Sequence, residues 1–306
     1  MIIALDGPAG SGKSTIAKRV ASQLGFTYLD TGAMYRAVAW LALHRGINLD
    51  DGTALGRIAA DEPIDFDNPS QEAQDTELTG VSISGQDVTT QIRTPQVDAV
   101  VSKVSAHAEV RRALVDAQRR IGAGRDVVME GRDIATVVFP AAEVKIFLTA
   151  SPEVRAARRF VQNATKDDAT NAQGSGAAGD TSQGNSEKAS FMQGNFGQDS
   201  FAKGDDQTRH QQMLEQINRR DKLDSERDLS PLRAATDSVI IDTSEMTIEQ
   251  VCQKIVALVC RWQCEHQCEG ASRPILPAVK QHDDEGDSHK AGISLQMPPS
   301  IEDARR

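Results

Sequence analysis

Short apolar runs alternate with stretches of helical periodicity from residue 1 to residue 149. The run MIIAL opens the chain, and Ile16, Val20 and Leu24 follow it at the spacing of one helical face. Four later runs have the length and bounding residues of buried strands: FTYLD at 26–30, DVVME at 126–130, VKIFLTA at 144–150 and SVIID at 238–242. Because helical stretches separate these runs, the pattern predicts a parallel sheet covered by helices on both faces.

The pattern changes between residues 64 and 88. Here the segments are short and polar, and SISGQDV places Gly85 where a hairpin turn needs a glycine. We expect a small antiparallel insertion beside the main sheet.

Two stretches show no periodicity. Residues 162–208 are rich in Gly, Asn, Gln, Ser and Asp, a composition that cannot bury enough apolar surface to offset the entropy of ordering. We therefore expect disorder there. The alternative is a docking motif, because Phe191, Phe196 and Phe201 recur every five residues. The tail 263–306 is also expected to be disordered.

Composition narrows the classes of function. The chain has 306 residues, 39% of them hydrophobic, and a net charge of −10. That charge argues against general nucleic-acid binding. No apolar run approaches the length of a membrane span and no secretory leader is recognisable, so we expect a cytoplasmic protein without membrane contact.

The four cysteines lie close together near the C-terminus. Cys260, Cys264 and Cys268 recur every four residues after Cys252, and His266 lies among them. A metal cluster is conceivable, but the C-x2-C spacing of common zinc sites is missing. Buried or idle thiols are the favoured interpretation in a reducing compartment.

The segment GPAGSGKST directly follows the first apolar run. It fits the pattern G-x-x-x-x-G-K-[ST]. A strand precedes this glycine-rich loop and a helix follows it, a context that distinguishes a phosphate-binding loop from a chance match. Lys13 is expected to reach the β- and γ-phosphates, and the Ser14 hydroxyl to bind magnesium. The predicted nucleotide site comprises Gly7, Pro8, Ala9, Gly10, Ser11, Gly12, Lys13, Ser14 and Thr15.

Charged side chains follow the later strands, at the edge where open α/β sheets bind ligands. The clusters are LDTGAMYR, EGRDIATVVFP and RRDKLDSER. Within the last, Arg220, Asp224 and Arg227 have the i, i+4, i+7 spacing of one helical face. Solvated, salt-bridged faces are the alternative. Arginines combined with carboxylates suit an acceptor that carries both phosphate and hydroxyl or amine groups, such as a nucleoside monophosphate.

Six motifs together resemble the bacterial cytidylate kinase family: GPAGSGKST, YLDTGAMYR, IRTPQV, MEGRDIATVVFP, VKIFLTAS and RRDKLDSERDLSPL. The likeness implies an α/β fold: a P-loop kinase core with a parallel sheet flanked by helices, a small antiparallel monophosphate-binding insertion and a helical lid. We expect the kinase domain at 1–262, the monophosphate-binding insertion at 46–105, the lid region at 155–227 with its low-complexity segment 162–208, and the tail at 263–306.

The resemblance also implies roles for individual residues. Arg36 and Arg132 should hold the acceptor phosphate, while Ser102, Arg111 and Asp133 should read the cytosine. Asp224 should meet the ribose with Arg220 beside it, and Arg227 should help to close the site. Asp30 and Thr31 complete the predicted acceptor site.

Three arginines are candidates for the lid. Arg155, Arg158 and Arg159 share one helical face by their spacing. Within the whole set, the resemblance points to Lys13, Arg132, Arg158 and Arg220 as catalytic. Two departures from the family pattern stand out: Ala135 replaces a frequent Gly, and about forty extra residues separate Arg159 from Arg219.

The implied reaction transfers the γ-phosphoryl group of MgATP to CMP or dCMP, with ATP and Mg²⁺ as cofactors and a monomer as the expected state. A kinase for another small acceptor and a P-loop ATPase or switch are the alternatives. A guanine-specific switch would normally carry N-K-x-D, which the sequence lacks.

Overall fold

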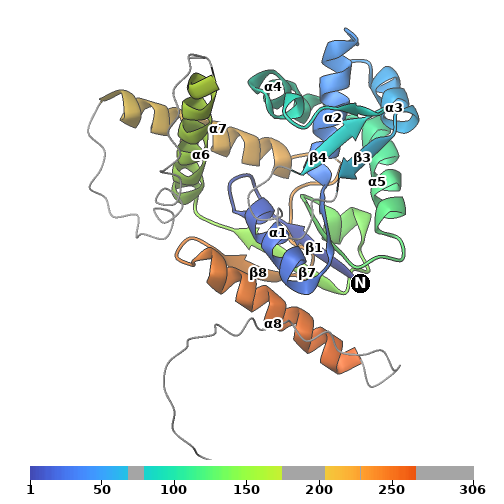
Figure 1. The fold of residues 1–306 in the computed structure, drawn as a ribbon, viewed down its shortest axis with the longest axis vertical. Helices are drawn as coiled ribbons and strands as arrows, with labels where there is room; N and C mark the ends of the chain where they lie inside the picture. The colour runs from blue at the N-terminus through green and yellow to red at the C-terminus, as the bar shows by residue number, and fades with distance from the viewer. Residues whose placement is uncertain (68–78, 174–203, 228, 267–306) are drawn as a thin grey trace, which may run out of the picture. The chain divides into compact units, whose positions relative to one another are not determined.

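The computed structural model describes residues 1–67, 79–173, 204–227 and 229–266, all within one compact unit, Met1–Ile275. Its main sheet consists of β1 (Ile2–Asp6), β2 (Thr27–Asp30), β6 (Val127–Gly131), β7 (Val144–Thr149) and β8 (Val239–Asp242). The strand order is β2-β6-β1-β7-β8 and every pairing is parallel (Figure 1). The predicted parallel sheet is confirmed, and all five apolar runs form strands.

Alternate residues of the strands face two separate cores. Ile3 and Leu5 of β1 pack with α1 (Lys13–Leu24) and α8 (Ile248–His266). Ile2 and Ala4 face the other side, toward α5 (Ala108–Gly122) and the π-helical turn η2 (Ile134–Val138). The central strands β1 and β6 are therefore buried on both faces, which explains why they read as continuous apolar runs, whereas the edge strand β8 is largely exposed.

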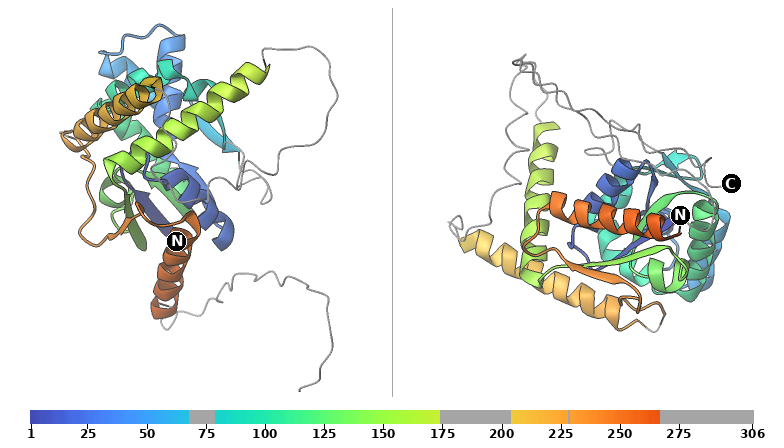
Figure 2. Two further views of the ribbon diagram at one scale, coloured as in Figure 1. Left: turned by 90° about the vertical axis from the view of Figure 1, so that its left-hand side faces the viewer. Right: turned by 90° about the horizontal axis from the view of Figure 1, so that it is seen from below.

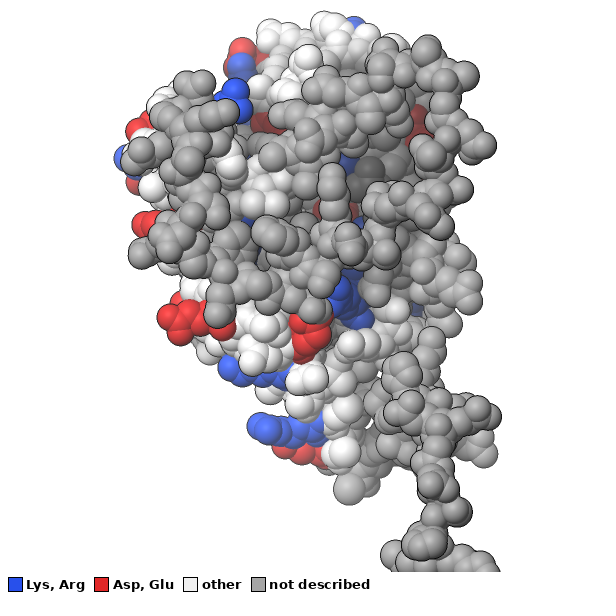
Figure 3. Space-filling model, turned by 60° about the vertical axis from the view of Figure 1, so that its left-hand side comes forward, with Lys and Arg blue, Asp and Glu red and all other residues white. Residues whose placement is uncertain are grey.

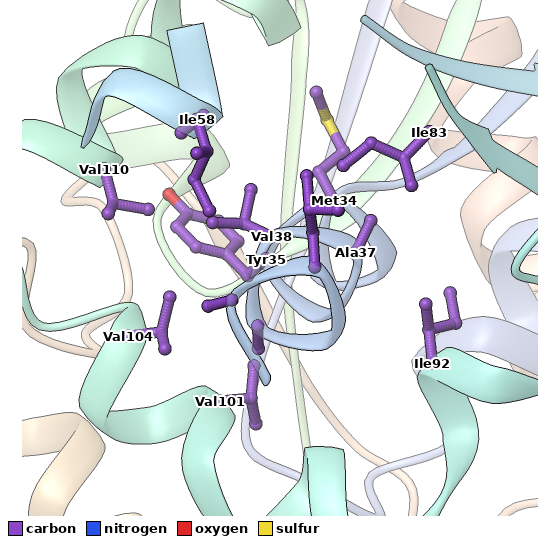
Figure 4. Packing of buried hydrophobic residues seen from close by; sticks show 14 of the residues in the cluster. Met34, Tyr35, Ala37, Val38, Ile58, Ile83, Ile92, Val101, Val104 and Val110 are labelled. Atoms are coloured by element: carbon purple, nitrogen blue, oxygen red, sulfur yellow. The ribbon is translucent and has the colours of Figure 1, made fainter. Parts of the chain in front are cut away.

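A third core holds the insertion together. It joins α2 (Thr31–His44), α3 (Gly52–Asp61), α4 (Pro95–Val104) and α5 to the antiparallel strands β3 (Ile64–Asp67), β4 (Gly80–Ile83) and β5 (Gln86–Asp87). Figure 4 shows side chains of α2 packed against its neighbours here. The turn between β4 and β5 has positive φ at Ser84 (53°) and Gly85 (76°), so the predicted hairpin is confirmed.

Two long helices form the lid region. α6 (Pro152–Gln173) and α7 (Gly204–Ser225) pack against each other in all views (Figures 1 and 2). Helix thus covers both ends of 162–208, where the sequence predicted disorder, and α8 covers the first four residues of the predicted tail. The prediction of disorder for 174–203 and 267–306 lies outside the described residues.

Charge on the described surface is mixed. On the face in Figure 3, acidic and basic side chains lie beside one another instead of forming a patch of one sign. None of the helices in the described residues combines the length and apolar character needed to cross a bilayer.

Candidate active site

The phosphate loop joins β1 to α1 and bends sharply at its glycines. Gly10 and Gly12 have φ of 78° and 89°, values that side chains rarely tolerate. At Gly7 a Cβ atom would lie 2.0 Å from the Leu148 carbonyl oxygen of β7, so only glycine fits there. Gly12 directly precedes the first turn of α1. The exposed backbone N–H groups and the helix dipole at this end favour an anion.

Lys13 lies inside the loop. Its side chain is buried, and Nζ donates to the Pro8 carbonyl oxygen over 2.6 Å. Burial lowers the pKa of Lys13 well below its ordinary value, and nearby Arg132 lowers it further, whereas Glu130 opposes the shift. The Lys13 ammonium is therefore poorly solvated and lies close to a second cation; its contact with phosphate stays a prediction.

Glu130, at the end of β6, faces the start of α1. It accepts hydrogen bonds from the Ser14 hydroxyl at 3.0 Å and from the Tyr28 hydroxyl. Burial raises the pKa of Glu130 to about 7, Asp30 adds to the rise, and Lys13 opposes it. Hydroxyl and carboxylate oxygens are the ligands that Mg²⁺ prefers, usually completed by waters and substrate phosphates. The oxygens of Ser14 and Glu130 are of a type that fits a magnesium ion; the sequence prediction named Ser14 and did not name Glu130.

Asp30 and Thr31 support the local backbone. Asp30 caps α2 by accepting from the backbone N–H of Ala33 at 3.1 Å. The Thr31 hydroxyl donates to the Glu130 carbonyl oxygen over 2.7 Å. Thr31 thus ties the start of α2 to the end of β6, whereas Asp30 caps α2. An acceptor would have to share the Asp30 carboxylate with this cap.

Arg111 and Asp133 form a buried ion pair. Their side chains are 8% and 7% exposed, and Arg111 Nη2 donates to Asp133 Oδ2. Arg111 Nη1 also donates to the Ser105 carbonyl oxygen at 3.3 Å. Ser102 lies one turn earlier on α4, where its carbonyl oxygen accepts from the Ser105 hydroxyl over 3.1 Å. The structure therefore brings together two of the predicted cytosine-reading residues, Arg111 and Asp133, whereas Ser102 is linked to them only through its backbone and Ser105.

Asp6 fixes the loop that carries Asp133. Its buried carboxylate accepts from the backbone N–H groups of Ile134 at 2.9 Å and Ala135 at 2.8 Å. Burial raises the pKa of Asp6 to about 6, against these two hydrogen bonds, which lower it. The sequence prediction missed Asp6, which is the last residue of an apolar strand. Ala135 is absent from the described residues with positive φ, so the loop does not require glycine there.

Arg132, Asp224 and Arg227 form a second charged group. Asp224, 2% exposed, accepts from Arg132 Nε at 3.2 Å and from Arg227 Nη2 at 2.5 Å. α7 ends at Ser225, so the prediction that one helical face carries Arg227 as well is wrong. Arg227 reaches back from beyond the helix end. Burial lowers the pKa of Arg220, one turn before Asp224, to about 10, and Arg132 adds to that shift.

Arg36 extends from α2 toward α4. Its Nη2 lies 2.6 Å from Asp98 Oδ1, and its Nη1 donates to the Ile92 carbonyl oxygen at 3.2 Å. Arg159 of α6 approaches the same carboxylate at 3.7 Å. Asp98 was not predicted as a site residue. It links the predicted acceptor-phosphate arginine to the lid region.

The other two arginines of α6 contact the phosphate loop or its support. Arg155 Nη1 donates to the Ala9 carbonyl oxygen at 3.2 Å, and Nη2 pairs with Asp221 of α7 at 2.6 Å. Arg158 donates to Thr243 through Nη1 at 2.9 Å and Nη2 at 2.7 Å. The Thr243 hydroxyl in turn donates to the Ser11 carbonyl oxygen over 3.2 Å. Both arginines lie where closure over bound phosphates can use them.

The family model for cytidylate kinase matches residues 3–175 and 197–261. The chain belongs to the cytidylate kinase family. A cytidylate kinase of Bacillus licheniformis is 40% identical over 260 residues, which cover 85% of this chain and 96% of that protein. A cytidylate kinase of Pelotomaculum thermopropionicum is 42% identical over 257 residues, which cover 84% of this chain and 95% of that protein.

A fused relative shows the same match. The bifunctional pantoate ligase/cytidylate kinase of a Synechococcus strain is 42% identical over 257 residues, covering 84% of this chain but 40% of that protein. The resemblance inferred from the motifs is thus confirmed. The cytidylate kinase model passes over residues 176–196, which lie within the low-complexity segment singled out from the sequence.

Proposed function

We propose that this protein transfers the γ-phosphoryl group of ATP, bound with Mg²⁺, to the phosphate of CMP or dCMP. Family membership supports a phosphotransfer between nucleotides that uses ATP as donor. The base, the metal and the individual residue roles rest on the contacts of the site.

The observation that carries the proposal is the proximity of two cationic groups. Arg132, expected at the acceptor phosphate, and Arg220, expected beside the ribose, lie close enough to Lys13 of the phosphate loop to lower its pKa. Glu130 and Asp6 offset part of the repulsion between these cations, and bound anions would offset the rest. Two phosphate groups, one of a donor and one of an acceptor, provide those anions.

The donor side is formed by the loop and its neighbours. The loop's backbone N–H groups, which Pro8 lacks, and the start of α1 bind the donor phosphates, and Lys13 neutralises charge on the transferred group. Ser14 and Glu130 would hold Mg²⁺, which would neutralise negative charge on the phosphates. Arg155 and Arg158 approach the same loop from α6.

The acceptor side needs no general base. An acceptor phosphate is already an anionic nucleophile, so catalysis depends on orientation and charge neutralisation. Arg36 and Arg132 provide planar guanidinium groups that bind two oxygens at once. Asp224 and Arg220 lie beside them for the ribose, and Arg227 approaches Asp224 from beyond α7.

The Arg111–Asp133 pair accounts for cytosine. A carboxylate accepts from the exocyclic amine of cytosine, and a guanidinium donates to its ring nitrogen or carbonyl. Uracil would present a carbonyl to Asp133 and leave a buried group unpaired, which such sites discriminate against strongly. Ser102, one turn from Ser105, is placed to complete the set.

A panel of nucleoside monophosphates tests the proposal. ADP production from MgATP should rise steeply with CMP and dCMP and only weakly with UMP, AMP or GMP. Turnover that is indifferent to the acceptor would favour a P-loop ATPase, and preference for another monophosphate would reassign the substrate. The expected monomeric state and cytoplasmic location stay predictions.

A further inference from the structure

Tyr35 lies directly behind the base-reading pair. It belongs to α2, and the Arg111 guanidinium carbon lies 5.6 Å from the centre of its ring. Figure 4 shows the Tyr35 side chain surrounded by apolar residues of the insertion, including Ile58, Val104 and Val110. Tyr35 is 9% exposed, so the cation and the ring face each other out of water. Cation–π contacts are strongest under these conditions.

Gln118 lies on the same helix face as Arg111. The two residues are seven positions apart on α5, which places them on one face, two turns apart. Gln118 is 1% exposed. Because α5 precedes β6 and runs antiparallel to it, Arg111 lies at the site edge of the sheet and Gln118 lies deeper. Gln118 is therefore placed behind the site rather than in it.

The polar atoms of these two residues lack hydrogen-bond partners among the described residues. They are the Tyr35 hydroxyl, Gln118 Nε2 and Gln118 Oε1. Burial raises the pKa of the Tyr35 phenol to about 12, while Arg111 and the neighbouring Gln118 amide lower it. The phenol thus stays a neutral donor next to an amide that can accept. Unpaired buried polar atoms are costly, and Phe and Leu would fill the same space without that cost.

We propose that Tyr35 and Gln118 are positioning residues for base recognition. The ring of Tyr35 supports the Arg111 guanidinium in the orientation that pairs with Asp133, and the neighbouring Gln118 amide pairs with the Tyr35 hydroxyl when a nucleotide occupies the site. This inference rests on the proposed reading of cytosine by Arg111 and Asp133. It adds two residues that touch no substrate but control discrimination between cytosine and uracil.

The test compares kcat/KM for CMP and UMP in purified variants. Tyr35→Leu, which removes the ring, should lower the CMP:UMP ratio about 10- to 30-fold, the value of a buried cation–π contact. Tyr35→Phe and Gln118→Met, which each remove one hydrogen-bonding partner, should lower it about threefold to fivefold. The double variant Tyr35→Phe/Gln118→Met should lower the CMP:UMP ratio no further than either single variant, because each substitution removes the same interaction.

Met34→Leu is the matched control. Met34 is adjacent in sequence, also buried (1% exposed) and directed to the Ile83 side of α2 (Figure 4). Its CMP:UMP ratio should stay within about twofold of wild type, as for a volume-conserving swap away from the site.

Three outcomes would overturn the inference. Tyr35→Leu could lower kcat/KM for CMP and UMP equally. The effects of Tyr35→Phe and Gln118→Met on the CMP:UMP ratio could multiply in the double variant. Met34→Leu could shift the ratio as much as Tyr35→Leu does. If Tyr35→Leu does not fold, the Tyr35→Phe and Gln118→Met cycle decides alone. A wild-type enzyme without preference for CMP over UMP would instead contradict the proposed function itself.

Discussion

Removing the Asp133 carboxylate should destabilise the protein and narrow its base preference together. In Asp133→Ala, the Arg111 side chain keeps its bond to the Ser105 carbonyl but loses its buried counter-ion. Removing one partner of a buried ion pair leaves an uncompensated charge and costs about 3–5 kcal/mol. We expect a loss of that size in the free energy of unfolding, measured by urea denaturation.

Two further variants isolate the cause. Asp50→Ala removes an exposed carboxylate, 74% accessible, that pairs with Lys103 at 2.7 Å. Exposed pairs contribute about 0–1 kcal/mol, so this variant measures the effect of losing an acid as such. Adding Arg111→Met to Asp133→Ala removes the buried charge and should recover part of the lost stability, a coupling that a double-mutant cycle detects.

The Asp133→Ala variant also tests base specificity. Asp133→Ala should reduce kcat/KM for CMP far more than for UMP, because only cytosine donates to the missing carboxylate. The reasoning is refuted if Asp133→Ala is as stable as Asp50→Ala, if the effects of Asp133→Ala and Arg111→Met simply add, or if CMP and UMP lose activity equally.

Three other predictions follow from the site. Lys13→Ala should lower turnover by several orders of magnitude with little change in melting temperature, and activity above about a tenth of wild type would contradict its role in charge neutralisation. Burial raises the pKa of Glu130 to about 7, so the folded state binds the extra proton. The free energy of unfolding should therefore fall as pH rises from about 4.5 to about 7. Glu130→Gln should reduce this dependence, and an unchanged pH profile would contradict it. Replacing residues 174–203 with a short Gly-Ser linker should preserve fold and activity, since loop-closure entropy changes slowly with length; a loss of more than a few degrees in melting temperature would show that the segment packs on the core.

The sequence predicted the features that depend on local pattern. Apolar runs identified every strand of the main sheet, and most clearly β1 and β6, because strands buried on both faces show no polar alternation. The phosphate loop was readable because Gly7, Gly10 and Gly12 are required by backbone geometry within a few residues. Arg111 and Asp133 came from resemblance alone, since nothing in their spacing brings α5 and the loop after β6 together.

Contacts between distant segments were harder to predict. Asp6 supports the loop after β6 across the sheet, and Asp98 joins Arg36 to Arg159 across two helices. Neither pairing has a sequence spacing that could reveal it. Arg227 shows the opposite error: its i+7 spacing from Arg220 suggested a continuous helix, but α7 ends two residues earlier. The polar composition at the inner ends of 162–208 likewise concealed the helices that continue into it.

The destination of the phosphoryl group tests the central claim most directly. The enzyme is mixed with ATP labelled at the γ-phosphate, Mg²⁺ and CMP, the reaction is stopped within a single turnover, and the products are separated by ion-exchange chromatography. The account predicts that the label appears in CDP and that Lys13→Ala abolishes its formation. Label released as inorganic phosphate at the same rate with and without CMP would contradict the account.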